Sequence, residues 1–172
     1  MFTPFKAAIL NHHASTPSFD GPVTQTLNRA DFDSAEKEIS NWDGYAETPL
    51  LDLPGLAGNL GIRQLRYKHE GPRFGLGSFK ALGGAYAVLR TVQRELSKSI
   101  GKLVDPDDIR SGLYAEQTKA ITVTSATDGN HGRSVAWGAA QFHTNCRIYI
   151  HAEVSEHRAD VMRKLGAEVI RV

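Results

Sequence analysis

Residues 121–132 read Ile-Thr-Val-Thr-Ser-Ala-Thr-Asp-Gly-Asn-His-Gly, and they are the clearest guide to the architecture of the chain. The β-branched run at 121–124 predicts a strand, and the small and polar residues after it predict a loop. Asn130 is expected to cap the next helix, because apolar residues recur at helical spacing from Val135 to Phe142. Loops at strand ends line the ligand crevice of an open parallel sheet. The segment therefore predicts a strand, a ligand-facing loop and a helix, although Asp-Gly-Asn alone is also typical of an ordinary turn.

The segments on either side continue this alternation of strands and helices. Strands are expected at 62–67, 120–124, 147–150 and 167–172, and helices at 78–96, 130–142 and 155–165, the last of them closed by Gly166. One further helical turn is expected at 106–109, inside a polar connection. Alternation of this kind is typical of right-handed βαβ units. The sequence therefore predicts an α/β fold with an open parallel sheet.

The N-terminal residues differ in character from the rest. Residues 1 to about 30 are rich in His, Ser, Thr, Pro and Asn without a sustained period, which indicates a loose arm. A short helix is expected from Asp31, acting as its cap, to Ser40, before a turn at Trp42–Tyr45. We therefore expect an N-terminal arm with a short helix over 1–47 and the main α/β region over 48–172.

The composition excludes some classes of partner. A net charge of +1 gives no electrostatic reason to expect a nucleic acid or an anionic membrane. The 172 residues can bury a core, and 41% hydrophobic with 23% charged residues is ordinary for a soluble protein. No apolar run approaches the roughly 18 residues of a membrane span, and the start lacks the pattern of a secretory signal. Residence in the cytoplasm is therefore expected.

Cys146 is the single cysteine of the chain. One cysteine excludes an internal disulfide and fits a reducing compartment. Since it opens a strand-like run, Cys146 is expected to be a small core residue.

A lysine stands in the expected first turn of an apolar helix, within the segment Gly-Ser-Phe-Lys-Ala-Leu-Gly-Gly at 77–84. Ser78 can cap that helix by accepting from the N–H of Lys80 or Ala81. The positive end of a helix disfavours a second cation, and only a free amine attacks the carbonyl group of a cofactor. The segment therefore suits Schiff-base chemistry at Lys80, and the alternative is an ordinary solvated lysine.

Two other classes of site are not supported. The glycines at 75–77 and 83–84 lack the Gly-Lys-Ser/Thr ending of a nucleotide P-loop and the spacing of a dinucleotide fingerprint. His151, Glu153 and His157 straddle a strand end and a helix start, so no metal site is expected there. The charged residues of the following helix are expected to form its solvated face. They are Arg158, Asp160, Arg163 and Lys164.

The two motifs together resemble the fold-type II family of pyridoxal-phosphate enzymes, the family similar to the tryptophan synthase β chain. The resemblance rests on Arg-Phe-Gly-Leu-Gly-Ser-Phe-Lys-Ala-Leu-Gly-Gly-Ala-Tyr-Ala at 73–87, on Ala-Thr-Asp-Gly-Asn-His-Gly-Arg at 126–133, and on Trp42, Tyr45 and Thr48-Pro49-Leu50 upstream. Within the family, these motifs look like those of the ammonia-lyases that act on 2,3-diaminopropionate. The resemblance starts near Trp42 and implies the N-terminal part of such an enzyme. One departure is His69, where relatives usually carry an aspartate, and it weakens any argument about ion pairing there.

The resemblance implies pyridoxal 5'-phosphate as cofactor and roles for particular residues. Lys80 holds the cofactor as a Schiff base, is displaced by the substrate amine, and then acts as a base on the α-hydrogen. Phe79 and Asn130 contact the cofactor, Asn130 through the phenolic oxygen. The substrate is expected to lie on the loop, whose binding residues are Ser125, Thr127, Asp128, Gly129 and His131.

Asp128 is the residue that discriminates between activities. The corresponding loop of serine and threonine dehydratases generally lacks a carboxylate before Gly-Asn, whereas the ammonia-lyases carry one. It can serve as a second base for the D-isomer, and it could equally attract the β-amino group of the substrate. The resemblance implies loss of that amino group to give aminoacrylate, which hydrolyses to pyruvate and ammonia. A dehydratase of the serine or threonine type is the alternative activity.

The resemblance also implies parts that these residues do not supply. Enzymes of the family need a later glycine-rich loop for the cofactor phosphate and a residue facing the pyridine nitrogen. A non-catalytic fragment, able to pair through the open strand at 167–172, is therefore the alternative from a different class. For the whole enzyme we expect a cytoplasmic homodimer with a small amino-acid substrate and with no nucleic acid, membrane or metal partner.

Overall fold

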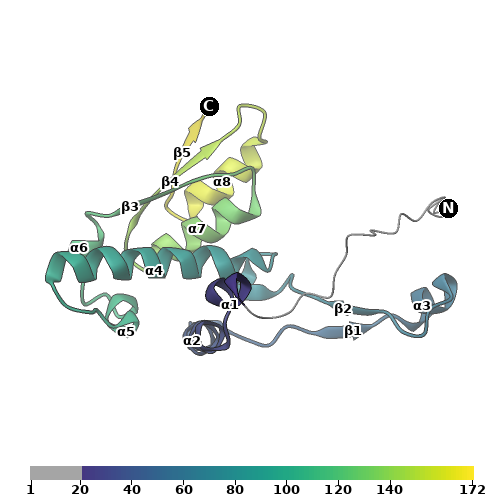
Figure 1. Ribbon diagram of the computed structural model, residues 1–172. Coiled ribbons are helices and arrows are strands. Elements are labelled where there is room, and N and C mark those ends of the chain that lie inside the picture. The colour runs from purple at the N-terminus through teal and green to yellow at the C-terminus, as the bar shows by residue number, and fades with distance from the viewer. Residues whose placement is uncertain (1–20) are drawn as a thin grey trace. The chain divides into compact units, whose positions relative to one another are not determined.

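The computed structural model describes residues 21–172, and the chain divides into a part that ends at Ser34 and a part from Ala35 to Val172. Helix α1 (Pro22–Thr26) lies in the first part, and α2 (Arg29–Ser40) begins there and ends in the second (Figure 1). Residues 1–20 of the loose arm expected over 1 to about 30 lie outside the described residues. Residues 21–30 hold α1 and the start of α2, so the prediction is wrong for this part.

Helix α2 starts two residues earlier than expected, because its cap is Asn28 and not Asp31. The Asn28 Oδ1 accepts from the N–H of Asp31 at 2.8 Å, and its Nδ2 donates to the Asp31 carboxylate at 2.6 Å. A cap side chain that accepts from the third helical residue is the usual arrangement. After the helix, the N–H of Tyr45 donates to the carbonyl of Trp42 at 3.0 Å, which confirms the expected turn.

A small antiparallel sheet follows. It pairs β1 (Leu50–Asp52) with β2 (Arg66–Lys68), and α3 (Pro54–Leu60) lies between the two strands (Figure 1). The strand expected at 62–67 overlaps β2 only at residues 66 and 67. It pairs in the antiparallel sheet and is not part of the parallel one. Strand β1 has three residues, too few for a period of two to be recognised, and that pairing was not foreseen.

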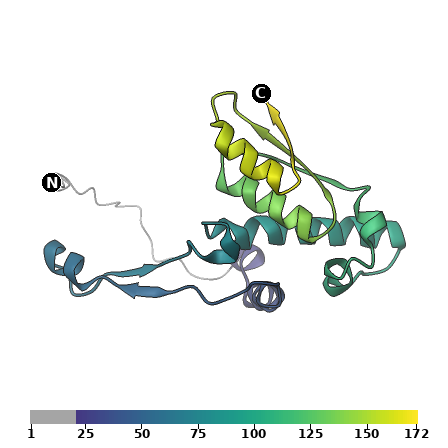
Figure 2. The ribbon, with the colours of Figure 1, turned by 180° about the vertical axis from the view of Figure 1, so that it is seen from behind.

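The main sheet is parallel, as predicted, with the order β3 (Thr122–Ala126), β4 (Asn145–Ile150), β5 (Glu168–Arg171). Helix α7 (Asn130–Gln141) connects β3 to β4, and α8 (Glu156–Lys164) connects β4 to β5. Both helices cover one face of the sheet (Figures 1 and 2). Gly166, with φ of 88°, follows α8 as expected for a helix end. The expected α/β fold is therefore confirmed.

Helix α4 (Lys80–Ile100) packs against α7 on the side of α7 away from the sheet (Figures 1 and 2). Its apolar residues recur at helical spacing, and the buried ones include Ala85, Leu89 and Leu96. These residues belong to the same core as Phe142, whose side chain is 1% exposed. The rings of Phe142 and Trp42 pack edge to face, with their centroids 5.6 Å apart. This core holds α4 in place beside the sheet.

Small residues let α4 and α7 approach each other closely. A Cβ atom at Gly84 would lie 2.4 Å from the Ser134 Oγ, and one at Gly138 would lie 2.7 Å from the Ala85 Cα. The Ser134 hydroxyl in turn donates to the carbonyl of Lys80 at 2.7 Å. Close packing therefore fixes the start of α4, where the motif lysine stands.

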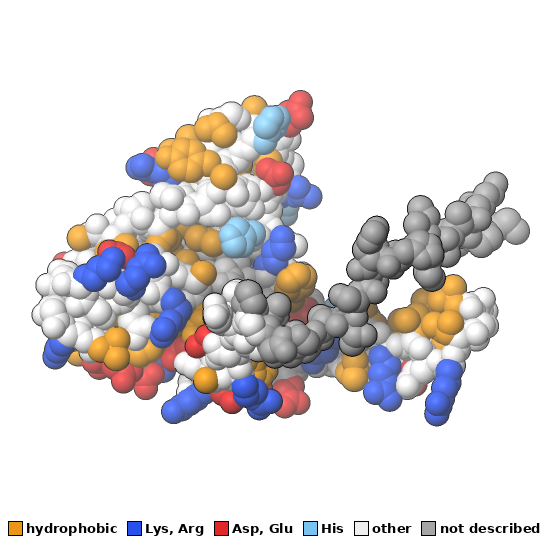
Figure 3. All heavy atoms as spheres, viewed as in Figure 1, with side chains coloured by type: hydrophobic (Ala, Val, Ile, Leu, Met, Phe, Trp, Pro, Cys, Tyr) orange, Lys and Arg blue, Asp and Glu red, His pale blue; other side chains and the backbone are white. Residues whose placement is uncertain are grey.

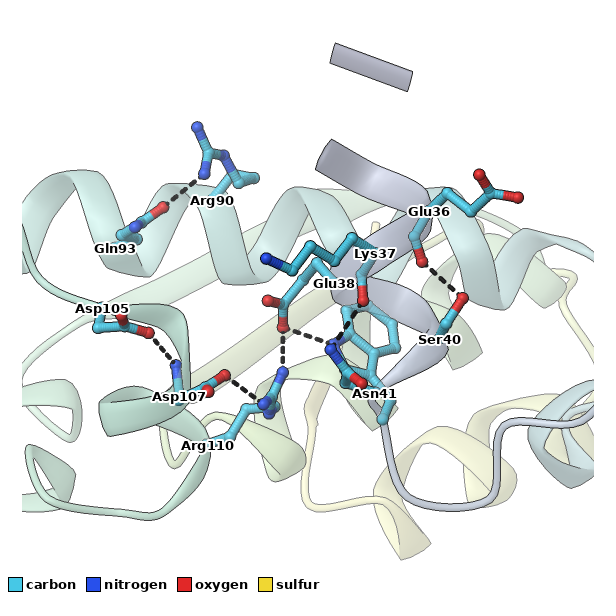
Figure 4. A network of polar contacts seen from close by, with 11 residues as sticks. Glu36, Lys37, Glu38, Ser40, Asn41, Arg90, Gln93, Asp105, Asp107 and Arg110 are labelled. Atoms are coloured by element: carbon cyan, nitrogen blue, oxygen red, sulfur yellow. Dashed lines mark hydrogen bonds and ion pairs between the residues drawn. The ribbon is translucent and has the colours of Figure 1, made fainter. Parts of the chain in front are cut away.

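Two short helices connect α4 to β3. Helix α5 (Pro106–Arg110) confirms the expected turn, with Asp105 as its cap, and α6 (Ala115–Thr118) was not expected. Arg110 also pairs with Glu38 of α2, and that carboxylate accepts from the Trp42 indole N–H at 2.8 Å (Figure 4). This network ties α5 to the end of α2.

None of the helices within residues 21–172 is both long enough and apolar enough to cross a membrane. Helix α4 has 21 residues, but its outer face carries charged side chains such as Arg90, Arg94 and Lys98.

Candidate active site

A part-buried ion pair between Glu70 and Arg73 holds the segment that leads to Lys80. Arg73 is 7% exposed, and its Nε donates to Glu70 at 2.9 Å. The same guanidinium donates to the carbonyl of Ala46 at 2.8 Å and to the hydroxyl of Thr48 at 3.1 Å. The bond from Arg73 is the main reason that the pKa of Glu70 is lowered to about 2. The network therefore anchors the base of the glycine-rich loop.

His69, the position that departs from the family pattern, lies beside this ion pair without joining it. Its ring stacks on Tyr67 at 5.6 Å, and its Nδ1 is buried and has no hydrogen-bond partner among the residues described. The ion pairing in this segment therefore falls to Glu70 and Arg73.

The loop after the ion pair turns sharply. Phe74, Gly75 and Gly77 have φ of 49°, 68° and 71°, which glycine adopts freely and phenylalanine does not. Phe74 lies in the 3-10 turn η1 (Arg73–Gly75), and its ring stacks on Trp137 at 4.9 Å, a contact that offsets the backbone strain.

The backbone of Lys80 is held from two sides. The Ser78 Oγ accepts from the N–H of Lys80 at 3.2 Å, the bond that the sequence predicted, but Ser78 is not the cap, because Phe79 stands in the cap position of α4. The carbonyl of Lys80 accepts from Ser134 of α7. Lys80 is the first residue of α4, and its side chain is exposed. The amine therefore extends from a fixed helix start.

The second motif forms the loop between β3 and α7. Gly129 stands in the cap position of α7, and Asn130 is its first helical residue and makes no capping bond, so the expected Asn130 cap is wrong. The Thr127 hydroxyl instead accepts from the N–H groups of Gly129 and Gly132, both at 3.4 Å. A Cβ at Gly132 would lie 2.5 Å from the Thr127 side chain, so only glycine permits this approach.

The two motifs meet at one cavity of about 390 Å³. It is lined by Lys80, Asp128, Gly129, Asn130, Arg133, His157, Arg158, Val161 and Met162. The structure thus brings Lys80 together with three of the predicted loop residues. Their convergence follows from the contact between α4 and α7 and from the position of the loop at the carboxyl end of β3.

Four other predicted residues do not line this cavity. Phe79 precedes Lys80 and is 62% exposed. Ser125 is half-buried in β3 and pairs with Ile148, and Thr127 is half-buried and holds the loop. His131 is exposed on the first turn of α7.

Arg133 of α7 lines the cavity although the sequence reasoning gave it no separate role. Its Nη2 donates to the carbonyl of Gly75 at 3.2 Å, which links α7 to the glycine-rich loop. Its Nε is buried and has no hydrogen-bond partner within residues 21–172. A guanidinium with an unpaired donor beside the cavity suits an anionic ligand.

His157 and Arg158 come from the first turn of α8. Arg158 is exposed, as expected of a solvated face, but its Nη1 also donates to the carbonyl of Asp128 at 3.3 Å. Helix α8 starts just after the carboxyl end of β4, next to that of β3. The rule that ligands bind beyond the carboxyl ends of parallel strands could have found these two residues.

A larger hollow lies elsewhere among the described residues. It has about 760 Å³ and lies along the C-terminal half of α4, where Arg90, Arg94, Lys98 and Lys102 are among its lining residues. Blue side chains gather over this end of α4 in Figure 3. No residue of either motif lines it, so the smaller cavity is the candidate site. The described residues contain no cluster of three or more His, Cys, Asp or Glu fit to hold a metal.

The residues around the smaller cavity fit a small anionic carbonyl compound. Lys80, Arg133 and Arg158 outnumber the single carboxylate of Asp128, so the cavity favours a phosphate, phenolate or carboxylate. Lys80 offers an amine for a carbonyl carbon, and Asn130 offers an amide donor. A volume of about 390 Å³ is within the usual range for small-molecule sites.

An open α/β sheet whose strand-end loop shares a cavity with a lysine suits the binding of an aldehyde cofactor. Residues 42–172 match the model of the pyridoxal-phosphate-dependent enzymes, and the chain belongs to that family. The family's cofactor is pyridoxal phosphate, and the fold is of type II, as the resemblance implied.

Several of the individual relatives are diaminopropionate ammonia-lyases. That of Salmonella typhimurium is 40% identical over 124 residues, which cover 72% of this chain and 30% of the relative. That of Escherichia coli (strain K12) is 34% identical over 157 residues, which cover 91% of this chain and 38% of the relative. The crystal structure of the holo enzyme from Escherichia coli superposes with a TM-score of 0.69 at 33% identity, over 84% of this chain and 36% of that one. The chain therefore spans well under half the length of these relatives.

Proposed function

We propose that the protein is a pyridoxal-phosphate-dependent carbon–nitrogen lyase that eliminates ammonia from D- and L-2,3-diaminopropionate. The observation that carries the proposal is the presence of Lys80 and Asp128 on one cavity. An amine and a carboxylate that face a single ligand can act as two separate bases. The similarity to diaminopropionate ammonia-lyases supports the choice of substrate.

Lys80 is the residue we assign to the attachment of the cofactor. When bound, pyridoxal phosphate supplies a carbonyl carbon for amines and a ring that stores the electrons of a carbanion. The side chain of Lys80 is exposed and extends from a fixed helix start, so its amine is available to bind the cofactor. With the substrate bound, the Lys80 Nζ would take the α-proton of one isomer.

Asp128 is the second base in this proposal, acting on the D-isomer. Its carboxylate belongs to the loop, whereas the Lys80 amine belongs to α4, so the two groups approach a ligand from different elements. Loss of the α-proton and of the β-amino group gives aminoacrylate. Its hydrolysis balances the reaction as diaminopropionate and one water to pyruvate and two ammonia.

Binding is assigned to the remaining residues around the loop. Asn130 and Arg133 line the cavity as donors, and Asn130 is assigned to the phenolic oxygen of the cofactor, with Phe79 beside Lys80. The substrate carboxylate is assigned to the loop, through its hydroxyls and N–H groups. The loop residues proposed to bind substrate are Ser125, Thr127, Asp128, Gly129 and His131.

The proposal extends to the whole protein. We assign residues 1–47 to an arm with a short helix and residues 48–172 to the catalytic region, and we expect a cytoplasmic homodimer with neither a nucleic acid nor a membrane as partner. The balanced charge of +1 supports the last point.

Borohydride reduction of the cofactor-loaded, full-length protein tests the assignment of Lys80. Reduction traps a Schiff base, and peptide mass spectrometry locates the modified lysine. We expect the adduct on Lys80 in the wild type and no adduct in Lys80→Ala, with Lys102→Ala as the control because that side chain lines the other hollow. A persistent adduct on another lysine would contradict the assignment.

The same preparation decides between the two activities. We expect faster turnover of diaminopropionate than of serine or threonine, measured as pyruvate or 2-oxobutyrate formed. Faster turnover of a hydroxyamino acid would assign the protein to the dehydratases.

A further inference from the structure

Asp128 and Arg158 stand together between two neighbouring cavities. Besides the cavity of Lys80, both residues line a second one of about 420 Å³, together with His151, Glu153, Val154 and Ser155. The Arg158 Nη1 donates to the carbonyl of Asp128 at 3.3 Å. A side chain from α8 thus contacts the backbone of the residue to which we assign the second base.

Backbone hydrogen bonds hold the loop on either side of Asp128, from the Thr127 N–H to the Tyr149 carbonyl at 2.9 Å and from the Arg133 N–H to the Gly129 carbonyl at 3.1 Å. The peptide between Asp128 and Gly129 has longer contacts, at 3.4 Å from its N–H to the Thr127 hydroxyl and at 3.3 Å from Arg158 to its carbonyl. Gly129 lacks a Cβ, so the peptide between it and Asp128 rotates at little steric cost. Rotation of that peptide moves the Asp128 carbonyl and changes the backbone angle ψ of Asp128, and the rotamers open to a side chain depend on its backbone angles.

Arg158 and Arg163 lie on the same helix but bond in different directions. Arg163 pairs with Glu156 and, at 2.8 Å, with Asp160 on its own helix. Arg158 reaches instead from α8 across to the loop after β3. The bond therefore joins two elements that are far apart in the sequence.

We propose that Arg158 is a positioning residue, which holds the peptide of Asp128 so that its carboxylate faces the cavity shared with Lys80. A base must lie within hydrogen-bond reach of the proton that it takes, so its direction controls its rate. Arg158 thereby sets the ratio of D-isomer to L-isomer turnover. This inference rests on the proposed function, because it needs Asp128 to act on the D-isomer.

The kinetic test compares variants of the cofactor-loaded, full-length protein on D- and L-diaminopropionate. In Arg158→Met we expect the ratio of kcat for D over L to fall about tenfold or more, since one hydrogen bond that orders a base is lost. Arg158→Lys keeps one donor and should restore part of the ratio. Asp128→Asn gives the largest fall, and Arg163→Met, with the same change on the same helix, leaves the ratio unchanged.

A second readout needs neither substrate nor cofactor. Amide hydrogen exchange of the apo-protein, followed by mass spectrometry, reports the order of the loop over residues 125–133. We expect faster exchange in this peptide for Arg158→Met and no change for Arg163→Met.

Three outcomes would overturn the inference. An unchanged ratio with unchanged exchange would show that Arg158 does not position the loop. A rise in KM for both isomers with an unchanged ratio would make Arg158 an anchor for the substrate carboxylate instead. Equal losses of kcat for both isomers would indicate a merely structural role.

A different result would refute the proposed function itself. If the wild type turned over neither isomer, the proposed function and the effect on the D-isomer would both be refuted. Hydrogen exchange would then decide alone whether Arg158 orders the loop.

Discussion

The half-buried Glu70 and the buried Arg73 form an ion pair that supports the glycine-rich loop. Their side chains are 17% and 7% exposed, and the pair also bonds to Thr48 and to the carbonyl of Ala46. Removing one partner of such a pair leaves the other charge without compensation. The loop therefore depends on the charge of Glu70.

The Glu70 carboxylate should make the fold sensitive to acid. Its pKa is about 2 in the folded chain against an ordinary 4.5, so its contribution to the free energy of unfolding is complete above about pH 4.5. That contribution, about 3 kcal/mol, is lost as the pH falls from 4.5 towards 2. Denaturant unfolding from pH 7 to pH 2 should show a flatter dependence for Glu70→Gln than for the wild type.

Glu95→Gln is the matched control for this measurement. Glu95 also bonds to a cation, Arg94 at 2.9 Å, but the two side chains are 40% and 64% exposed. We expect Glu95→Gln to keep the acid dependence of the wild type, because water screens an exposed pair. A wild-type stability that did not change below pH 4.5 would contradict the role of Glu70.

The contact between α4 and α7 depends on residues without side chains. A Cβ at Gly138 would lie 2.7 Å from the Cα of Ala85, and a backbone atom cannot move aside cheaply. The contact matters for the site, because Ser134 of α7 holds the carbonyl of Lys80. Helix packing and the position of the lysine are therefore linked.

We expect Gly138→Ala to lower the free energy of unfolding by about 1–3 kcal/mol, the usual cost of overpacking. Gly83→Ala is the control, since nothing lies within 4 Å of its Cβ position. Alanine there should be neutral or stabilise the helix by up to about 1 kcal/mol. Thermal or denaturant unfolding measures both, and equal stabilities of the two variants would argue against a tight contact.

How far the sequence predicts each element depends on its length. Helices α4, α7 and α8 and the strands β3 to β5 were foreseen, because periodicity over many residues identifies them. The three-residue strand β1 and its antiparallel pairing with β2 were not foreseen, since register depends on a distant partner. The caps Asn28 and Gly129 were also missed, because several neighbouring residues can cap a helix and packing selects one.

The sheet and its helices form one core that includes Cys146, so the reactivity of this thiol measures how well the core excludes solvent. Cys146 lies in β4, between β3 and β5, and is 6% exposed, as expected from the sequence. Burial raises the pKa of its thiol to about 11. Only the thiolate attacks disulfide reagents, so the folded chain should be nearly inert to them.

We expect the native protein to react with a disulfide reagent at pH 8 only as fast as it unfolds. The thiolate fraction at that pH is about one in a thousand for a pKa of about 11. In a variant with Ser99→Cys the new thiol, at the exposed end of α4, should react at once and serve as the control. Rapid labelling of Cys146 in the native wild type would mean that the sheet opens locally.

The local sequence and the tertiary packing determine different features of this protein. The residues around Lys80 and the Ser125–His131 loop could be singled out from the sequence as candidates, because glycine-rich turns and strand ends depend mainly on near neighbours and because the two motifs resemble those of a known family. Which of them share a cavity was decided only by tertiary structure: Arg133 and Arg158 enter the site, whereas Ser125 and His131 do not line it. A cavity arises where α4, α7 and α8 meet, and the packing of these helices against one another has no signature in any single segment.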